Sequence, residues 1–181
     1  MENLKNTVFQ TAIFGGGCFW CLEPVFNALD GVLDVRPGYC GGHIDHPTYE
    51  QVCRQDTGHV ETVQVAFDPE KVAYRTLLEV FFGTHDPTTP DRQGNDVGPQ
   101  YASVIFCQDE AQRVLAETVC DEAQAAFDAP IVTRIEAAGA FWPAEAVHRE
   151  YYRRNPGQGY CQFIIAPKLA KFRQRYAQLL R

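Results

Sequence analysis

The sequence predicts an α+β layered fold built on a mixed sheet. Segments rich in β-branched and aromatic residues alternate with amphipathic helical segments along the 181 residues. One direct strand–loop–strand passage interrupts the alternation, which argues against a doubly wound parallel sheet. The sequence has no repeat, low-complexity tract or long linker, so we expect one domain over residues 1–181.

The first half of the chain predicts three strands and two helices. In order, we expect a strand at residues 8–14, a helix at 19–29, a strand at 32–39, a loop with one short helical turn at 40–57 and a strand at 60–67. Pro24 is expected near the first turn of its helix, where a missing N–H is tolerated. Asp68 and Pro69 predict the cap and first residue of the next helix, which carries an apolar stripe through Phe82.

The second half predicts two strands and three helices around a second long loop. In order, we expect a loop at residues 86–99, a strand at 101–107, a helix at 109–127, a strand at 131–137 and helices at 143–154 and 167–180. The 109–127 helix is expected to turn Val114, Leu115 and Val119 inwards, together with Ala111 and Ala126.

Composition excludes several classes of function. The formal net charge is −7 with no basic run, so nucleic-acid binding is not expected. No apolar stretch approaches the roughly 20 residues that cross a bilayer, and residues 1–14 lack the features of a signal peptide. An odd count of seven cysteines does not suggest a secreted disulfide scaffold. We therefore expect a cytoplasmic protein whose cysteines are mostly thiols.

Residues 15–21, Gly-Gly-Gly-Cys-Phe-Trp-Cys, are the strongest local signal. The glycines allow a tight turn, and Cys18 would then open a helix, where free N–H groups and the dipole favour a thiolate. A thiolate is the nucleophilic form of cysteine, so Cys18 is the candidate nucleophile. The alternative is a small buried cysteine beside a structural turn.

Cys18 and Cys21 form a C-x-x-C pair, which taken alone is typical of a dithiol redox motif. A zinc site would need a second pair at similar spacing, and the sequence has none. The stretch at residues 40–46 is glycine-rich, which favours a solvated loop over a metal site formed by Cys40, His43, Asp45 and His46. We expect no metal and no cofactor.

Glu61 lies in phase with Val63, Val65 and Phe67 on the strand face that should be buried. A buried carboxyl loses hydration, so its pKa should rise and it could act as an acid near neutral pH. A glutamate at a strand end that reaches water is the competing interpretation, and the pattern alone does not separate the two.

Other candidates are weaker on spacing alone. Tyr49 and Tyr101 follow loops and Asp96 lies inside one, where each could hydrogen-bond a ligand. Phe19 and Trp20 could wall an apolar pocket or anchor the helix to the sheet. Cys161 follows Gly157 and Gly159 in a segment, about 155–166, that we expect to be mobile and able to reach a modified Cys18.

Taken together, these residues resemble the A-type peptide methionine sulfoxide reductases over nearly the whole chain. The resemblance rests on motifs that occur in the same order: Gly17-Cys18-Phe19-Trp20, Pro37-Gly38-Tyr39, Gly41-Gly42, Pro47-Thr48-Tyr49, Gly58-His59-Val60-Glu61, His85-Asp86-Pro87-Thr88, Asp91-Arg92-Gln93-Gly94-Asn95-Asp96, Gly98-Pro99-Gln100-Tyr101, Phe141, His148, Tyr151, Asn155-Pro156 and Gly159-Tyr160-Cys161.

The resemblance implies a two-layer α/β sandwich with a ferredoxin-like core and a role in protein repair under oxidative stress. It implies reduction of the S-epimer of methionine sulfoxide, free or in oxidised proteins, with recycling by thioredoxin. Carried onto matching positions, Cys18 is the nucleophile and Glu61 protonates the sulfoxide oxygen. The family's other roles fall on Tyr49 and Tyr101, which help bind that oxygen, on Asp96, which contacts the substrate, and on Phe19 and Trp20, which form the S-methyl pocket.

The resemblance leaves the second thiol open. Cys161 matches a resolving position in several relatives, whereas many carry glycine where this chain has Cys21. A Cys18–Cys21 bridge would strain a helical turn, and a Cys18–Cys161 bridge needs the tail to swing in. We favour Cys161 and keep Cys21 as the alternative.

A general dithiol–disulfide oxidoreductase that uses Cys18 and Cys21 is the main rival function, and it would not need Glu61. A non-enzymatic methionine-binding module and a zinc-binding domain are more distant rivals. We expect a monomer.

Overall fold

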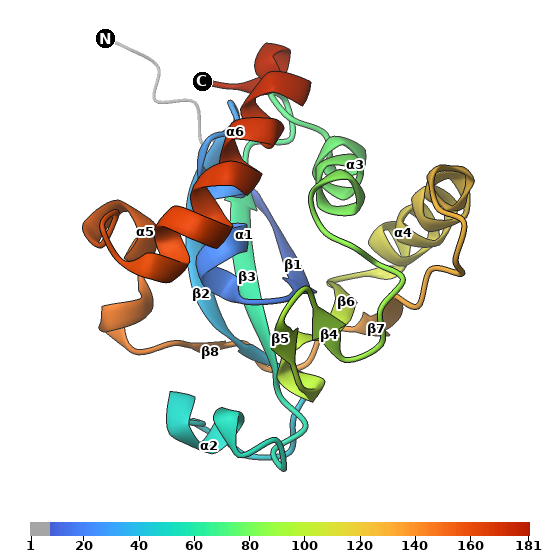
Figure 1. The fold of residues 1–181 in the computed structure, drawn as a ribbon. Coiled ribbons are helices and arrows are strands. Elements are labelled where there is room, and N and C mark those ends of the chain that lie inside the picture. The colour runs from blue at the N-terminus through green and yellow to red at the C-terminus, as the bar shows by residue number, and fades with distance from the viewer. Residues whose placement is uncertain (1–7) are drawn as a thin grey trace, which may run out of the picture.

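The computed structural model describes residues 8–181 (Figure 1). Residues 1–7 lie outside this range, and they are half of the stretch on which the signal-peptide prediction depends. The main elements, in chain order, are β1 (Gln10–Gly16), α1 (Phe19–Asn27), β2 (Val32–Cys40), α2 (Tyr49–Cys53), β3 (Val60–Phe67), α3 (Tyr74–Thr84), β4 (Arg92–Gln93), β5 (Asp96–Val97), β6 (Ser103–Cys107), α4 (Glu110–Ala123), β7 (Arg134–Ala137), β8 (Trp142–Pro143), α5 (Tyr151–Arg154) and α6 (Ala166–Arg175).

Six strands form one mixed sheet in the order β7-β6-β1-β3-β2-β8. The β6–β7 pair is parallel, and the other neighbours in this sheet are antiparallel. The central strands lie in the order β6-β1-β3-β2, and the chain visits them as β1-α1-β2-β3-α3-β6. This is the β-α-β-β-α-β pattern of a ferredoxin-like core. The predicted α+β class and mixed sheet are confirmed.

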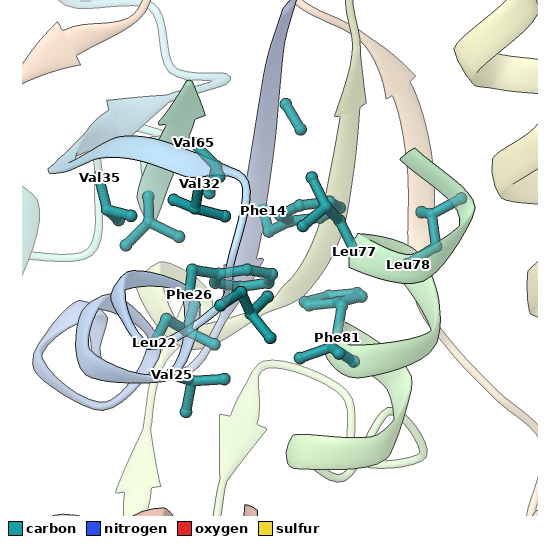
Figure 2. Packing of buried hydrophobic residues seen from close by; sticks show 14 of the residues in the cluster. Phe14, Leu22, Val25, Phe26, Val32, Val35, Val65, Leu77, Leu78 and Phe81 are labelled. Atoms are coloured by element: carbon teal, nitrogen blue, oxygen red, sulfur yellow. The ribbon is translucent and has the colours of Figure 1, made fainter. Parts of the chain in front are cut away.

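The main core lies between the sheet and the layer of helices that covers one of its faces. Phe14 of β1 stacks on Phe26 of α1 and on Phe81 of α3, with ring centroids 5.1 Å apart in both pairs. Figure 2 shows these rings surrounded by aliphatic side chains such as Leu22 and Leu77. Burial of these apolar side chains fixes α1 on the sheet and therefore positions the residues at its N-terminal end.

A smaller cluster covers the opposite face of the sheet. It contains Ile13, Cys40, Val60, Ala102, Val104 and Phe106. Ala12 and Phe14 belong to the main core and Ile13 to the smaller one, because successive side chains of a strand point to opposite faces.

The prediction of a helix at residues 143–154 is wrong. Trp142 and Pro143 instead pair with Tyr39 and Gly38 at the edge of the sheet, where a proline is tolerated. A short 3-10 turn follows, and Glu150 then adopts a left-handed conformation with φ of 52°, so that only the four residues of α5 are α-helical.

Three other helical predictions need correction. Asp68 and Pro69 form a turn, and α3 begins later, after Ala73. Pro24 lies in the interior of α1 rather than near its first turn. Helix α4 is rotated from the predicted face: Val114 is 50% exposed and Ala111 and Ala126 are exposed, whereas Gln112, Ala116 and Val119 are buried.

The segment before α6 forms a single π-helical turn, Cys161–Ile165, in which Cys161 is fully buried. Such turns are uncommon and often lie at functional sites. The stretch that the sequence predicted as one helix, 167–180, is divided in the structure. Helix α6 ends at Arg175, and a 3-10 turn follows over Ala177–Leu179.

Candidate active site

The glycine run continues β1 and then delivers Cys18 to the start of α1. Gly15 and Gly16 pair with Val104 and Ser103 of β6. Gly17 has φ of 95°, and a Cβ built on it would lie 2.7 Å from the side chain of Gln93, so a larger residue would be strained and crowded there. Cys18 is the extended N-cap residue of α1, as the sequence predicted.

The expectation that Cys18 rests as a thiolate is wrong for this structure. Only 9% of the residue is exposed, and burial raises the pKa of its thiol well above the usual value. The negative charge of Glu61 raises it further, while a hydrogen bond from the backbone N–H of Trp20 opposes these effects. Loss of hydration therefore outweighs the helix terminus, and the resting group is a thiol.

Glu61 is buried, which decides between the two interpretations that the strand pattern left open. It is 1% exposed, and burial raises its pKa to about 8. Its Oε2 accepts a hydrogen bond of 3.1 Å from the backbone N–H of Phe19, and hydrogen bonding with the Cys18 thiol also lowers its pKa somewhat. A protonated carboxyl near neutral pH thus lies directly beside the candidate nucleophile.

Aromatic side chains from distant segments gather around the start of α1. Trp20 stacks on Tyr151 with centroids 3.8 Å apart, and its Nε1 donates to Nδ1 of His148 at 3.1 Å. The His148 ring also packs against Phe19 at 5.2 Å and Tyr49 at 4.6 Å. The structure therefore brings Phe19, Trp20 and Tyr49 into one aromatic cluster.

The predicted polar residues also converge on this end of α1. Burial, and after it the charge of Glu61, raises the pKa of both Tyr49 and Tyr101, so the two hydroxyls stay protonated as donors. Asp96 accepts a hydrogen bond of 2.6 Å from the Tyr160 hydroxyl, whose oxygen lies 3.5 Å from Sγ of Cys21.

A cavity of about 540 Å³ opens beside the two cysteines of the C-x-x-C pair. Cys18, Cys21, Asp96 and Tyr160 line it, as do residues at the start of α6. Cys161 differs from these residues, because it has no exposed surface and belongs to the main core.

Sequence reasoning assigned no role to three residues that organise the site: His148, Tyr160 and Glu145. Glu145 accepts hydrogen bonds from the Tyr39 hydroxyl at 3.1 Å and from the Tyr49 backbone at 3.0 Å. His148 and Tyr160 occur in the motifs of the resemblance, which was the available signal, but their partners lie more than 60 positions away in the sequence.

Two features are absent from residues 8–181. In this part of the chain, no three His, Cys, Asp or Glu side chains are grouped as a metal site would require. No helix there has the length and apolar character needed to cross a membrane.

The chain is similar to known proteins over nearly its whole length. The family model for peptide methionine sulfoxide reductase matches residues 10–180. The peptide methionine sulfoxide reductase MsrA of Chromobacterium violaceum is 57% identical over 173 residues, which cover 94% of this chain and 98% of that protein. An MsrA of Thermus thermophilus is 52% identical over 172 residues, covering 95% of this chain and 98% of that protein.

A solved structure gives the same answer for the fold. Mxr1 from Saccharomyces cerevisiae in reduced form matches with a TM-score of 0.81 and 31% identity, covering 87% of this chain and 91% of Mxr1. Fold and sequence relatives together define an oxidoreductase. The chain belongs to the peptide methionine sulfoxide reductase family.

Proposed function

We propose that this protein reduces the S-epimer of methionine sulfoxide, free and in oxidised proteins, to methionine. The observation that carries the proposal is the pairing of a buried thiol, Cys18, with a carboxyl, Glu61, that stays protonated up to a pH of about 8. Sulfoxide sulfur becomes electrophilic when its oxygen is protonated, so one site must supply both an acid and a sulfur nucleophile.

The reaction runs in the following order. Glu61 donates its proton to the sulfoxide oxygen, with Tyr49 and Tyr101 donating hydrogen bonds to the same oxygen. Cys18 attacks the sulfur and passes its proton to the carboxylate that Glu61 has become, which the backbone N–H of Phe19, the residue after Cys18, holds at 3.1 Å.

As the new S–S bond forms, the S–O bond breaks, and the oxygen takes a second proton from the reprotonated Glu61 and leaves as water. Water then attacks the Cys18 sulfur and returns a proton to Glu61, the S–S bond breaks, and methionine leaves with its electron pair, so that Cys18 carries the oxygen as a sulfenic acid. The thiol gains an oxygen as the sulfoxide loses one, and it supplies the two electrons that reduce the sulfoxide, so the step balances without another reactant.

The remaining residues bind the substrate. Phe19 and Trp20 hold the S-methyl group in the aromatic cluster, where His148 and Tyr151 fix the orientation of the indole. Asp96, positioned by Tyr160, contacts the substrate at the edge of the site. A second thiol condenses with the sulfenic acid to form a disulfide and water, and thioredoxin reduces that disulfide.

A thioredoxin-type reductant is supported by the resemblance and by a relative. Mxr1 of Saccharomyces cerevisiae, with which this chain shares its fold, has also been solved in complex with Trx2. We further propose a single catalytic domain over residues 1–181 that acts as a cytoplasmic monomer, with residues 155–166 moving during the cycle.

Two thiols are candidates for the resolving step. Cys21 lines the same cavity as Cys18, and its backbone N–H donates to the Cys18 carbonyl at 3.0 Å. Because Cys18 is the extended N-cap residue, the pair does not lie within a complete helical turn. Cys161 is fully buried in the π-helical turn, so its use requires that turn to open.

Substitution distinguishes the two thiols. The two variants are Cys21→Ser and Cys161→Ser. The one that lacks the resolving thiol should keep full single-turnover methionine formation but lose multiple turnover with thioredoxin, because it cannot form the disulfide that thioredoxin reduces. Peptide mapping after one turnover should show the Cys18 disulfide in the other variant. Full thioredoxin turnover in both variants would contradict an intramolecular disulfide through either residue.

The proposed function is tested by incubating the protein with peptides that contain S- or R-methionine sulfoxide, with dithiothreitol as reductant. We expect methionine to form from the S-epimer alone. Reduction of insulin disulfides without methionine formation would instead establish the rival dithiol oxidoreductase, which requires only Cys18 and Cys21.

A further inference from the structure

The recycling step requires an external thiolate to reach a sulfur of the enzyme's disulfide. In the described part of the chain, both Cys18 and Cys21 border the same cavity of about 540 Å³, which opens to the surface beside α6. The approach to the active cysteines from this side is therefore shaped by the π-helical turn and by the first turns of α6.

Two lysines give this approach a positive charge. Lys168 and Lys171 line the cavity one helical turn apart on α6. Burial raises the pKa of the Cys21 thiol, and the positive charge of Lys168 is the largest effect opposing that rise. A nearby cation favours an attacking thiolate and stabilises a leaving one.

Apolar side chains lie next to the lysines. Phe163 is 78% exposed and Ile164 is 41% exposed, and Ile164 also lines the cavity. Large aromatic and aliphatic side chains that are exposed next to a reactive group indicate a protein contact, because a small reductant would need none.

We infer that Phe163, Ile164, Lys168 and Lys171 form the docking surface for a thioredoxin-type dithiol protein. The inference rests on the proposed function and adds to it the place where the reductant binds. A thioredoxin-type reductant presents a C-x-x-C thiolate, whose negative charge complements the two lysines. Phe163 and Ile164 supply the apolar contact that a protein partner needs.

The docked reductant completes a balanced exchange. Its thiolate attacks one sulfur of the enzyme disulfide, the S–S bond breaks, and the other enzyme sulfur leaves as a thiolate. The second thiol of the reductant then attacks the mixed disulfide. The reductant ends oxidised, and both enzyme cysteines end reduced.

The test compares two reductants on the same variants. Phe163→Ser should lower kcat/KM for thioredoxin roughly tenfold, as expected for loss of an aromatic anchor. Lys171→Glu should lower it as well, with an effect that shrinks at high salt. Turnover of Phe163→Ser with dithiothreitol should stay unchanged, because a small thiol needs no apolar docking surface, and Lys171→Glu should lose less with dithiothreitol than with thioredoxin.

Matched controls are exposed residues on other elements: Val114→Ser on α4, where Val114 is 50% exposed, and Lys71→Glu before α3. Both should behave as the parent protein with either reductant. Unchanged thioredoxin kinetics in Phe163→Ser and Lys171→Glu would overturn the docking surface, as would an equal loss with both reductants. A parent protein that reduces no sulfoxide with dithiothreitol would instead refute the proposed function.

Discussion

Cys18→Ser is expected to abolish methionine formation with either reductant. Loss of a catalytic nucleophile costs about 10⁴–10⁶ in kcat, and a serine hydroxyl cannot form the sulfenic acid that carries the oxygen away. The assay is methionine release from an S-methionine sulfoxide peptide, followed by mass spectrometry with dithiothreitol present.

The variant should fold normally, which separates a lost nucleophile from a lost structure. Cys18 is an N-cap residue whose side chain makes no capping hydrogen bond, and serine is a favoured N-cap. Its thermal midpoint should equal or slightly exceed that of the parent. Residual turnover within tenfold of the parent would show that another cysteine performs the attack.

Glu61→Gln is expected to lower the rate of the first turnover by about 10²–10⁴, the usual contribution of a general acid. The amide keeps the shape of the side chain and its carbonyl can still accept from the Phe19 N–H, but it has no proton of suitable acidity to give. Removal of a buried ionisable group should leave the free energy of unfolding unchanged or raised near pH 9.

The pH dependence follows from the direction of the Glu61 shift. Because burial raises the pKa of this carboxyl to about 8, the acid is protonated below that pH and loses its proton above it. The rate of the parent should therefore fall as the pH rises through about 8, and Glu61→Gln should lack this fall.

Single-turnover kinetics from pH 6 to 10 without added reductant measure this limb, because dithiothreitol titrates in the same range. Glu61→Asp is the matched control: it retains an acid and should keep a falling limb at reduced rate. A rate in Glu61→Gln that equals the parent at pH 7 would remove Glu61 from the chemistry.

Local pattern singled out Cys18 and Glu61 as candidates, although it did not decide whether Glu61 is buried. Strand alternation placed Glu61 in phase with the buried face of β3, and the glycine run placed Cys18 at the start of a helix. Both depend only on neighbouring residues. The resting protonation of Cys18 depends instead on burial by residues from elsewhere in the chain, which the residues around a helix terminus do not reveal.

The misplaced elements have the same cause. Residues 143–154 were expected to be helical, but Trp142 and Pro143 pair with β2, more than 100 positions earlier. On α4, the polar residue Gln112 is buried because its side-chain amide is hydrogen-bonded: its Nε2 donates to the Thr11 carbonyl at 2.9 Å. Hydrophobic periodicity cannot anticipate a buried glutamine whose hydrogen bond is supplied by a distant strand.

The most direct test of the account is to trap the oxidised nucleophile after one turnover. In a Cys21→Ser/Cys161→Ser variant without reductant, the account predicts one methionine per protein and a sulfenic acid at Cys18, detected by mass spectrometry after reaction with dimedone. Methionine release with Cys18 unmodified would contradict it.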